Sequence, residues 1–455
     1  MSKKLVNLLL LFLAVSVLTA GEQGYEELRS SMLSGNADLR KADEQVAQSA
    51  LDVKDAKASY QPTISLMAGA AYLANPPGVD IDMSDLSYAL YAMSSGTVSV
   101  PGTMSMELEN TYYMAGLSIT EPIITWGKRP KAVELYKNLA DISALSKMDL
   151  QDQLTVELKT SLTALKYMDE LLVLLDETEQ VAADLVQVSE DGYADGMLIK
   201  QDVTEARVEA LEVKVKKQEV LQLYSELLQS VRTITAQPEL ESSDILFTPD
   251  ENEIVYLASL DRDWLRAAAI DPEAAALRML NKQTAAYQAK ESVAKAGMYM
   301  IPDLALSVSA NVGGPKFPGQ KNWTDEDDWG LAITVGLSTT IWDGGKKLNE
   351  LKRSKSQVAG AIADYDQAVS QLSELAESSI SKMDLALAKL EWLEVKLEAE
   401  EGRLELLELK QELGAAAKTD VLSQKLDVLG YEMEMIEQKI SLAEAAYTIS
   451  YLARV

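Results

Sequence analysis

The longest uninterrupted helical pattern constrains this chain more than any other feature. From Lys346 to Lys410 there is no proline, and the only glycines are Gly360 and Gly402. At 1.5 Å per residue, one helix over this stretch would be on the order of 100 Å long. Ordinary globular helices are far shorter, so the stretch predicts a coiled coil or a stalk. A leucine series spaced mostly by three or four residues predicts a second long helix: Leu154, Leu158, Leu162, Leu165, Leu172 and Leu175.

Composition excludes most catalytic machinery. The 455 residues include no cysteine and no histidine, which removes disulfides, thiolate nucleophiles, zinc ribbons and every histidine-containing triad. With 42 Lys and Arg against 71 Asp and Glu, the formal net charge is −29, which argues against nucleic-acid binding. Only carboxylate chemistry remains, and no motif pairs two carboxylates across a cleft. We therefore expect no enzyme, no cofactor and no metal.

The first twenty residues have the pattern of an export signal. Lys3 and Lys4 precede a largely apolar run from Leu5 to Leu18, which ends in small residues. A secretory signal peptide over residues 1–20 is the prediction, and an N-terminal anchor helix is the alternative. No later stretch approaches about 18 consecutive apolar residues, so no later membrane helix is expected.

Four segments alternate with a period of two, as β-strands do: Thr63–Tyr72, Tyr112–Thr120, Leu304–Asn311 and Leu331–Ile341. In the last, every second residue from Leu331 to Leu337 is apolar, and the residues between them are small or polar. That pattern is typical of a strand in a lipid-facing β-barrel. A half-buried strand of a soluble sheet is the alternative. The loop within each pair of strands is rich in turn residues and acids.

Landmarks along the chain indicate an internal duplication. Three of them recur at one offset of 218: Gly127 as Gly345, Gly196 as Gly414 and Asp202 as Asp420. The predicted organisation is two structural repeats, 21–234 and 272–455, joined by a connector over 235–271. Each repeat would run helix, strand, loop, strand, long helix, turn, helix.

In this order the motifs resemble the TolC-type family of outer-membrane efflux proteins, over almost the whole chain after the signal segment. The residues from Lys57 to Pro62 are similar to the end of the family's first helix and the proline at its first strand. The stretch from Gly336 to Lys346 resembles the family's strand-to-helix signature. Gly196 with Asp202, and Gly414 with Asp420, are similar to its helix-hairpin motif.

The resemblance implies an α+β membrane protein, mostly long coiled-coil helices that form a periplasmic tunnel. Each protomer of a homotrimer would contribute four strands to one twelve-stranded barrel in outer-membrane lipid. Four strands cannot close a barrel and lipid tolerates no open sheet edge, so elementary physics also requires several copies. The implied location is the outer membrane of a Gram-negative bacterium, with most of the mass in the periplasm.

The implied function is a passive export duct in a tripartite efflux pump or a type I secretion system. The partners would be a periplasmic adaptor (membrane fusion) protein and an inner-membrane transporter of the RND or ABC type. An exported periplasmic or surface coiled-coil protein with a structural or adhesive role is the alternative.

The resemblance also assigns site residues. Asp202 and Asp420 would line the tunnel entrance, where three copies of each would form cation-favouring rings; capping of a helix start is the alternative, compatible with the rings. Gly196 and Gly414 would lie at hairpin tips that contact the adaptor. Ala416 and Ser423 stand where family members often carry an arginine and a second acid. Turns between strands and helices would use Pro62, Gly127, Pro302, Gly344 and Gly345.

Two further features are expected to serve the surface. The acidic loops around Asp80–Asp85 and Asp325–Asp328 lack the glycine and terminal glutamate of an EF-hand, so solvated loops are preferred to Ca²⁺ sites. Aromatic residues near strand ends fit membrane-interface girdles, with core packing as the alternative: Tyr72, Tyr112, Tyr113, Trp126, Trp323, Trp329 and Trp342.

Overall fold

The computed structural model describes residues 23–72, 74, 78–82, 103–107, 110–299, 301–314 and 329–455. The predicted signal peptide over 1–20 lies outside these residues. The chain divides into two compact units. We call residues 51–137 and 286–358 the sheet unit, and residues 1–50, 138–285 and 359–455 the helical unit.

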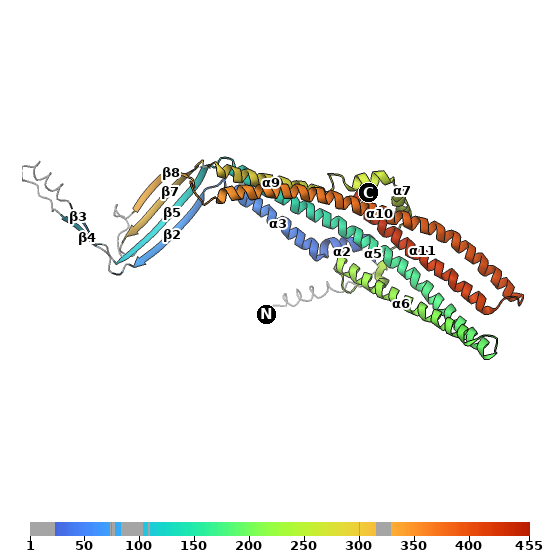
Figure 1. The fold of residues 1–455 in the computed structure, drawn as a ribbon. Helices are drawn as coiled ribbons and strands as arrows, with labels where there is room; N and C mark the ends of the chain where they lie inside the picture. Colours follow the sequence, from blue (N-terminus) through green and yellow to red (C-terminus); the bar gives the residue numbers. More distant parts are fainter. Residues whose placement is uncertain are drawn as a thin grey trace, which may run out of the picture. The chain divides into compact units, whose positions relative to one another are not determined.

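The sheet unit contains four antiparallel strands in the order β2-β5-β7-β8 (Figure 1). Their bounds are β2 Thr63–Tyr72, β5 Thr111–Ile124, β7 Asp303–Gly314 and β8 Trp329–Ser338. The register aligns one apolar row across all four strands: Ile64, Ile119, Val308 and Ile333. Because side chains alternate along a strand, such rows collect on one face of the sheet.

The observed strands differ from the predicted ones at their ends. β2 has the predicted bounds, whereas β5 and β7 extend beyond theirs. β8 ends at Ser338 and not at Ile341, because Ser338 pairs with Asp303, the first residue of β7. Pro302 precedes Asp303 and has no N–H with which to continue the ladder.

A second small sheet lies where the sequence predicted only a loop. β3 (Gly78–Asp82) pairs antiparallel with β4 (Thr103–Glu107). Val79 and Ile81 alternate with acids in β3, a two-residue period that the acidic composition of the loop obscured.

Two long helical hairpins dominate the chain, and their lengths repeat. The first consists of α5 (Lys128–Ala194) and α6 (Lys200–Thr235), the second of α10 (Lys346–Glu412) and α11 (Lys418–Ala453). The outgoing helices α5 and α10 have 67 residues each, and the returning helices α6 and α11 have 36 each. Both pairs start 218 residues apart (346 − 128 and 418 − 200), the offset of the sequence landmarks.

Shorter elements complete the described chain. α2 (Tyr25–Gly35) and α3 (Ala37–Ala58) precede β2, and α9 (Ala275–Met298) precedes β7. The stretch between α6 and α9 holds η1 (Ser242–Asp244), β6 (Ile245–Leu246), α7 (Glu251–Ser259) and α8 (Arg262–Ala269). β6 pairs in parallel with β1 (Gln23–Gly24). In the part of the chain that is described, no helix is long and apolar enough to span a membrane.

The core of the helical unit consists of several clusters. Leu28 and Met32 of α2 pack with Leu158 of α5 and Val231 of α6. A second cluster joins α7 and α8 to α10 and α11, around the fully buried Tyr447. A third joins the two hairpins, which lie side by side in Figure 1, through four larger apolar residues and two alanines: Val181, Leu185, Leu426, Leu429, Ala182 and Ala206.

Candidate functional site

Each helical hairpin turns at a glycine in the left-handed region of backbone conformation. Gly196 (φ +71°) lies between α5 and α6, and Gly414 (φ +72°) lies between α10 and α11. The chain then folds back on its own helix: the Met197 N–H donates to the Gly192 carbonyl at 2.8 Å, and the Ala415 N–H donates to the Lys410 carbonyl at 2.7 Å. A residue with a Cβ is strained at this φ, so both turns depend on glycine.

Asp202 and Asp420 lie six residues beyond these glycines, in the first turns of α6 and α11. The Asp202 carboxylate accepts the Ile199 N–H at 2.9 Å, and the Asp420 carboxylate accepts the Ala417 N–H at 3.3 Å. An acid at this position satisfies a free N–H and interacts favourably with the helix dipole. Each aspartate therefore stabilises a helix start within its own hairpin. Their rings at a tunnel entrance stay a prediction, because a ring requires several copies.

The two hairpin ends have different surfaces. Met197 and Ile199 are 75% and 62% exposed at the end of the first hairpin. The equivalent stretch of the second hairpin is three alanines, 415–417, preceded by the exposed Leu413. Ser423 is exposed and Ala416 is half-buried. Because both side chains are uncharged, neither supplies a charged contact at this end. The contact of both ends with an adaptor stays a prediction.

Polar contacts join strand ends to helix starts in the sheet unit. Pro62 precedes β2 and Pro302 precedes β7. The Trp126 indole N–H donates to the Pro302 carbonyl at 2.8 Å, and Lys128 forms an ion pair with Asp303 at 2.8 Å. These contacts attach the start of α5 to the start of β7, across 175 residues of sequence.

The predicted turn glycines lie in these junctions. Gly127 (φ +82°) precedes α5, and Gly344 (φ +71°) and Gly345 (φ +84°) precede α10. The Asp343 carboxylate accepts the N–H groups of Gly345 at 3.0 Å and Lys347 at 2.8 Å, so it caps the start of α10.

Arg129 is a junction residue that sequence reasoning missed. Its guanidinium donates to the Pro122 carbonyl at 2.6 Å, lies 3.6 Å from the Glu121 carboxylate and covers the Tyr60 ring at 5.2 Å. The equivalent residue in the second repeat, Lys347, donates to the Thr340 carbonyl at 3.1 Å. The available signal was the motif Gly127-Lys128-Arg129, which recurs as Gly345-Lys346-Lys347: the third residue of each motif donates to a carbonyl near the end of the preceding strand.

The two faces of the four-stranded sheet differ in chemistry. The apolar face is exposed, with Ile64 at 66% and Ile333 at 71%. The other face carries rows of hydroxyl and small residues, such as Thr63, Thr120, Ser307 and Thr334 in one register row. The Ser65 and Ser118 hydroxyls lie 2.9 Å apart, and those of Thr120 and Ser307 lie 3.4 Å apart. An exposed apolar face of this extent is unusual for a protein surrounded by water.

Carboxylates of neighbouring helices meet within the hairpins. Burial raises the pKa of Glu209 on α6, and the charges of Asp427 and Glu212 raise it further. Burial likewise raises the pKa of Glu432 on α11, with Glu177 and Glu401 adding to the effect. Hydrogen bonds from Lys396 and Gln424 hold the pKa of Glu400 below its ordinary value. The acidic character of the chain therefore extends into its helix contacts.

The other predicted surface features are only partly visible. Asp80 and Asp82 lie in β3, whereas residues 83–85 and all of Asp325–Asp328 lie outside the described residues, as does Trp323. Tyr72 ends β2 and Trp329 begins β8, while Trp126 and Trp342 follow β5 and β8. Over the described ranges, no group of three or more acids could hold a metal ion.

Comparison with known proteins agrees with this architecture. The family model described as outer membrane efflux protein matches residues 28–237 and 272–453. Among curated proteins, none matches the sequence.

Solved structures with similar folds share little sequence with the chain. A membrane protein from Pseudomonas aeruginosa has a TM-score of 0.73 at 14% identity, with 94% of this chain and 93% of that chain covered. The outer membrane protein VceC from Vibrio cholerae has a TM-score of 0.70 at 15% identity, with 94% and 95% covered. The CmeC outer membrane channel of Campylobacter jejuni has a TM-score of 0.72 at 14% identity, with 94% and 85% covered.

These likenesses confirm the predicted fold class, mostly long helices with a four-stranded sheet. The family model covers most of the chain in two stretches, and its description is one of efflux across the outer membrane. The chain belongs to the outer membrane efflux protein family, a family of transport proteins.

Proposed function

We propose that this chain is the outer-membrane subunit of a tripartite efflux pump or a type I secretion system. It acts as a passive export duct and catalyses no reaction. An inner-membrane transporter of the RND or ABC type delivers the substrate, and a periplasmic adaptor connects the transporter to the duct.

The observation that carries this proposal is the four-stranded sheet. One face is apolar and exposed, the opposite face is lined by hydroxyls, and β2 and β8 form its two edges. Lipid covers an apolar face favourably but leaves an open edge with unpaired N–H and C=O groups. Pairing β8 of one copy with β2 of the next removes every edge. Three copies give a homotrimer with a twelve-stranded barrel, whose hydroxyl face lines the channel.

The hairpin ends then form the periplasmic entrance of the duct. Three copies of Asp202 and of Asp420 surround its axis and favour cations. Gly196 and Gly414 mark the ends that contact the adaptor, and the exposed Met197 and Ile199 give the first hairpin the larger apolar contact.

Reconstitution in planar bilayers tests the duct. The purified protein is expected to be a trimer in mild detergent and to conduct ions without an energy source. Ile333→Lys places a charge on the apolar face and should prevent insertion, at a cost of about 2–4 kcal/mol per copy in lipid. Thr334→Lys places the same charge on the hydroxyl face, so it should insert normally and reduce cation conductance. A soluble monomer, or equal effects of both variants, would contradict the proposal.

The entrance ring has its own test in the same bilayers. Asp420→Ala should weaken block of the pore by a multivalent cation such as hexaamminecobalt, and Ser423→Ala is the matched control at the same end. Unchanged block in Asp420→Ala would remove Asp420 from the entrance.

A further inference from the structure

α6 and α10 each carry an exposed seam of uncharged residues with heptad spacing. The α6 seam is Gln201, Thr204, Val208, Leu211, Val215, Gln218, Gln222, Ser225 and Gln229. The α10 seam is Leu385, Ala388, Trp392, Val395, Ala399, Gly402, Leu406, Leu409 and, one residue past the helix end, Leu413. In both, steps of three and four residues alternate, and every member is exposed. This is the a and d pattern of a coiled coil that lacks its partner helix.

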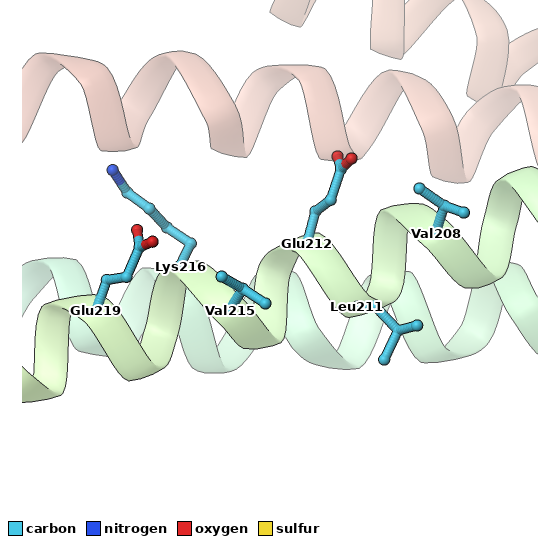
Figure 2. A pocket seen from close by; sticks show the side chains of 6 residues that line it. All are labelled: Val208, Leu211, Glu212, Val215, Lys216 and Glu219. Carbon is cyan, nitrogen blue, oxygen red and sulfur yellow. The ribbon is translucent and has the colours of Figure 1, made fainter.

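Neither seam is buried inside the protomer, although the Trp392 ring meets the Tyr431 ring of α11 edge to face, with centroids 6.4 Å apart. On α10 a second heptad series, displaced by two residues, packs against the protomer's own helices: Leu393 is 1% exposed, whereas Val395 on the α10 seam is 65% exposed. On α6, Val208, Leu211 and Val215 line an open groove, and Leu211 is 61% exposed. Figure 2 shows Leu211 pointing away from the neighbouring helix, toward which Glu212 and Lys216 extend.

The other two helices of the hairpins differ in this respect. From its start to Glu434, the exposed residues of α11 are Lys418, Asp420, Ser423, Asp427 and Glu434, four of which are charged. Exposed positions of α5 include Asp176, Glu177 and Asp184. Helices that face water carry charges, so the uncharged seams of α6 and α10 indicate surfaces that another helix covers.

The residues that flank the seams have a regular charge pattern. On α6 the residue after each d position is an acid: Glu205, Glu212, Glu219 and Glu226. On α10 the residue after each d position is a base: Lys389, Lys396, Arg403 and Lys410. Near the start of α6, the residue before each a position is a base: Lys200, Arg207 and Lys214. On α10 the residue before the a positions is an acid: Glu391, Glu398, Glu405 and Glu412. These are the e and g positions, which determine partner choice and orientation in coiled coils.

In an antiparallel pair of helices, e residues face e residues and g residues face g residues. An α6 seam against an α10 seam then puts acid opposite base on both sides of the contact. Two α10 seams would put Lys and Arg opposite each other, and two α6 seams would put Glu opposite Glu. The charges therefore favour the mixed pair and disfavour both self-pairs.

We propose that the α10 seam of one copy packs antiparallel on the α6 seam of a second copy. This proposal rests on the homotrimer of the proposed function and identifies the helical interface between its subunits. α10 runs toward its hairpin end and α6 runs away from its own, so copies with level hairpin ends bring the two seams together antiparallel. Because different surfaces meet, the interface is heterologous, and repetition around an axis closes a ring.

The seams also complement each other in size. With the hairpin ends approximately level, the nearest register that places a against d sets Val208 opposite Gly402 and Leu211 opposite Ala399. A Cβ added at Gly402 would meet nothing within 4 Å in the protomer, so space is free there for a valine of the second copy. In the same register Glu205 faces Arg403 and Glu212 faces Lys396. Arg403 also lies near Glu400 of its own helix, yet its side chain remains 65% exposed.

Cysteine crosslinking tests this contact directly, because the chain contains no cysteine. In Leu211→Cys/Ala399→Cys, mild oxidation of the full-length protein in detergent should give dimers and trimers on a denaturing gel. Either single variant should stay monomeric, since a heterologous contact never places a residue next to its own copy. Mixed single variants should give dimers only. Ala183→Cys/Ala399→Cys is the control, because Ala183 is exposed on α5, outside both seams.

A charge exchange separates the proposed contact from general damage. Glu205→Arg and Arg403→Glu should each reduce the trimer fraction measured by light scattering, and Glu205→Arg/Arg403→Glu should restore it. No restoration, or crosslinking by a single variant, overturns the seam contact. If light scattering shows a trimer but the Leu211/Ala399 pair stays uncrosslinked, the seam contact fails and the trimer stands. If the unsubstituted protein is a monomer, both proposals fail.

Discussion

The two helical hairpins have the same backbone lengths but different interiors near their ends. At positions 218 residues apart, the first hairpin buries Ala182 and Ala206, and the second buries Glu400 and Gln424. The Gln424 amide donates to the Glu400 carboxylate at 2.7 Å, and Lys396 donates to the same carboxylate at 2.5 Å. The duplication therefore fixes helix length and turn position, while contacts between the helices have diverged.

This difference has a mechanical consequence. Two buried alanines lose only packing when helices separate, whereas a buried polar pair exchanges its hydrogen bonds for bonds with water. Separation of α10 from α11 near the hairpin end therefore costs less solvation free energy than separation of α5 from α6. We expect the second hairpin to be the one that moves when the entrance opens.

The largest effects should be equal in the two hairpins. Leu175 is 0% exposed and its equivalent Leu393 is 1% exposed. Leu175→Ala and Leu393→Ala should each destabilise the protein by about 2–5 kcal/mol, through lost apolar contact and the cavity left behind. Thermal unfolding in detergent, followed by circular dichroism, measures the loss. A loss of stability in only one of the two variants would mean that the hairpins differ even at core positions where both have leucine.

The turn glycines should give the next largest effects. Gly196→Ala and Gly414→Ala force a Cβ into the left-handed region, at a cost of about 1–2 kcal/mol. Because the two φ values differ by only one degree, the two losses should agree. Gly430→Ala is the control: Gly430 lies inside α11, where alanine is the better helix former and a Cβ meets nothing within 4 Å. Stabilisation by all three variants would contradict the assigned turn geometry.

The repeated pattern of the fold could be predicted from sequence, because it depends on local periods. The alternation from Thr63 to Tyr72 gave the bounds of β2, and the lack of helix breakers after Lys346 gave α10 almost to its end. Gly196 and Gly414, 218 residues apart, predicted the positions of both hairpin ends. Each of these signals lies within a few residues of the structure that it predicts.

The helix contacts could not be predicted in the same way. α10 carries two heptad series, two residues apart, and spacing alone does not say which one is buried and which one is exposed. The Glu400–Gln424 pair depends on the register between α10 and α11, and this register cannot be inferred from the sequence of either helix alone. The β3–β4 pairing was hidden for the same reason, since it joins two segments that lie about twenty residues apart in the sequence.

Variants of the Glu400–Gln424 pair test whether this pair accounts for the difference between the hairpins. Gln424→Ala should lower the melting temperature less than the glycine variants do, because Glu400 keeps its contacts with Lys396 and Arg403. Glu400→Ala/Gln424→Ala recreates the interior of the first hairpin and should recover the loss. The converse variant, Ala206→Gln, buries an amide without a partner in the first hairpin and should destabilise it. Additive losses in the double variant would mean that the two residues do not act as a pair.

The smallest effect concerns like charges where the hairpins meet. Glu209 and Asp427 are equivalent residues of the two repeats. The pKa of Glu209 lies above its ordinary value of 4.5 because of burial and, after it, the charge of Asp427. A raised pKa means that the ionised form is disfavoured in the folded state, so stability from this group grows as pH falls and is lost as pH rises through that pKa. Glu209→Gln removes the charge and should stabilise the protein at pH 7 by about 0.5 kcal/mol or less, since the site is partly open to solvent.

The pH dependence identifies the cause of that gain. Well below pH 4.5 the glutamate is protonated in both folded and unfolded chains, so the advantage of Glu209→Gln should decrease toward zero as the pH falls through and below that value. Asp427→Asn removes the same repulsion from the other side. Glu209→Gln/Asp427→Asn should therefore gain less than the two single variants together. A gain that persists unchanged at pH 4, or full additivity, would place its origin in packing rather than in charge, and the two repeats would then differ at this position in shape alone.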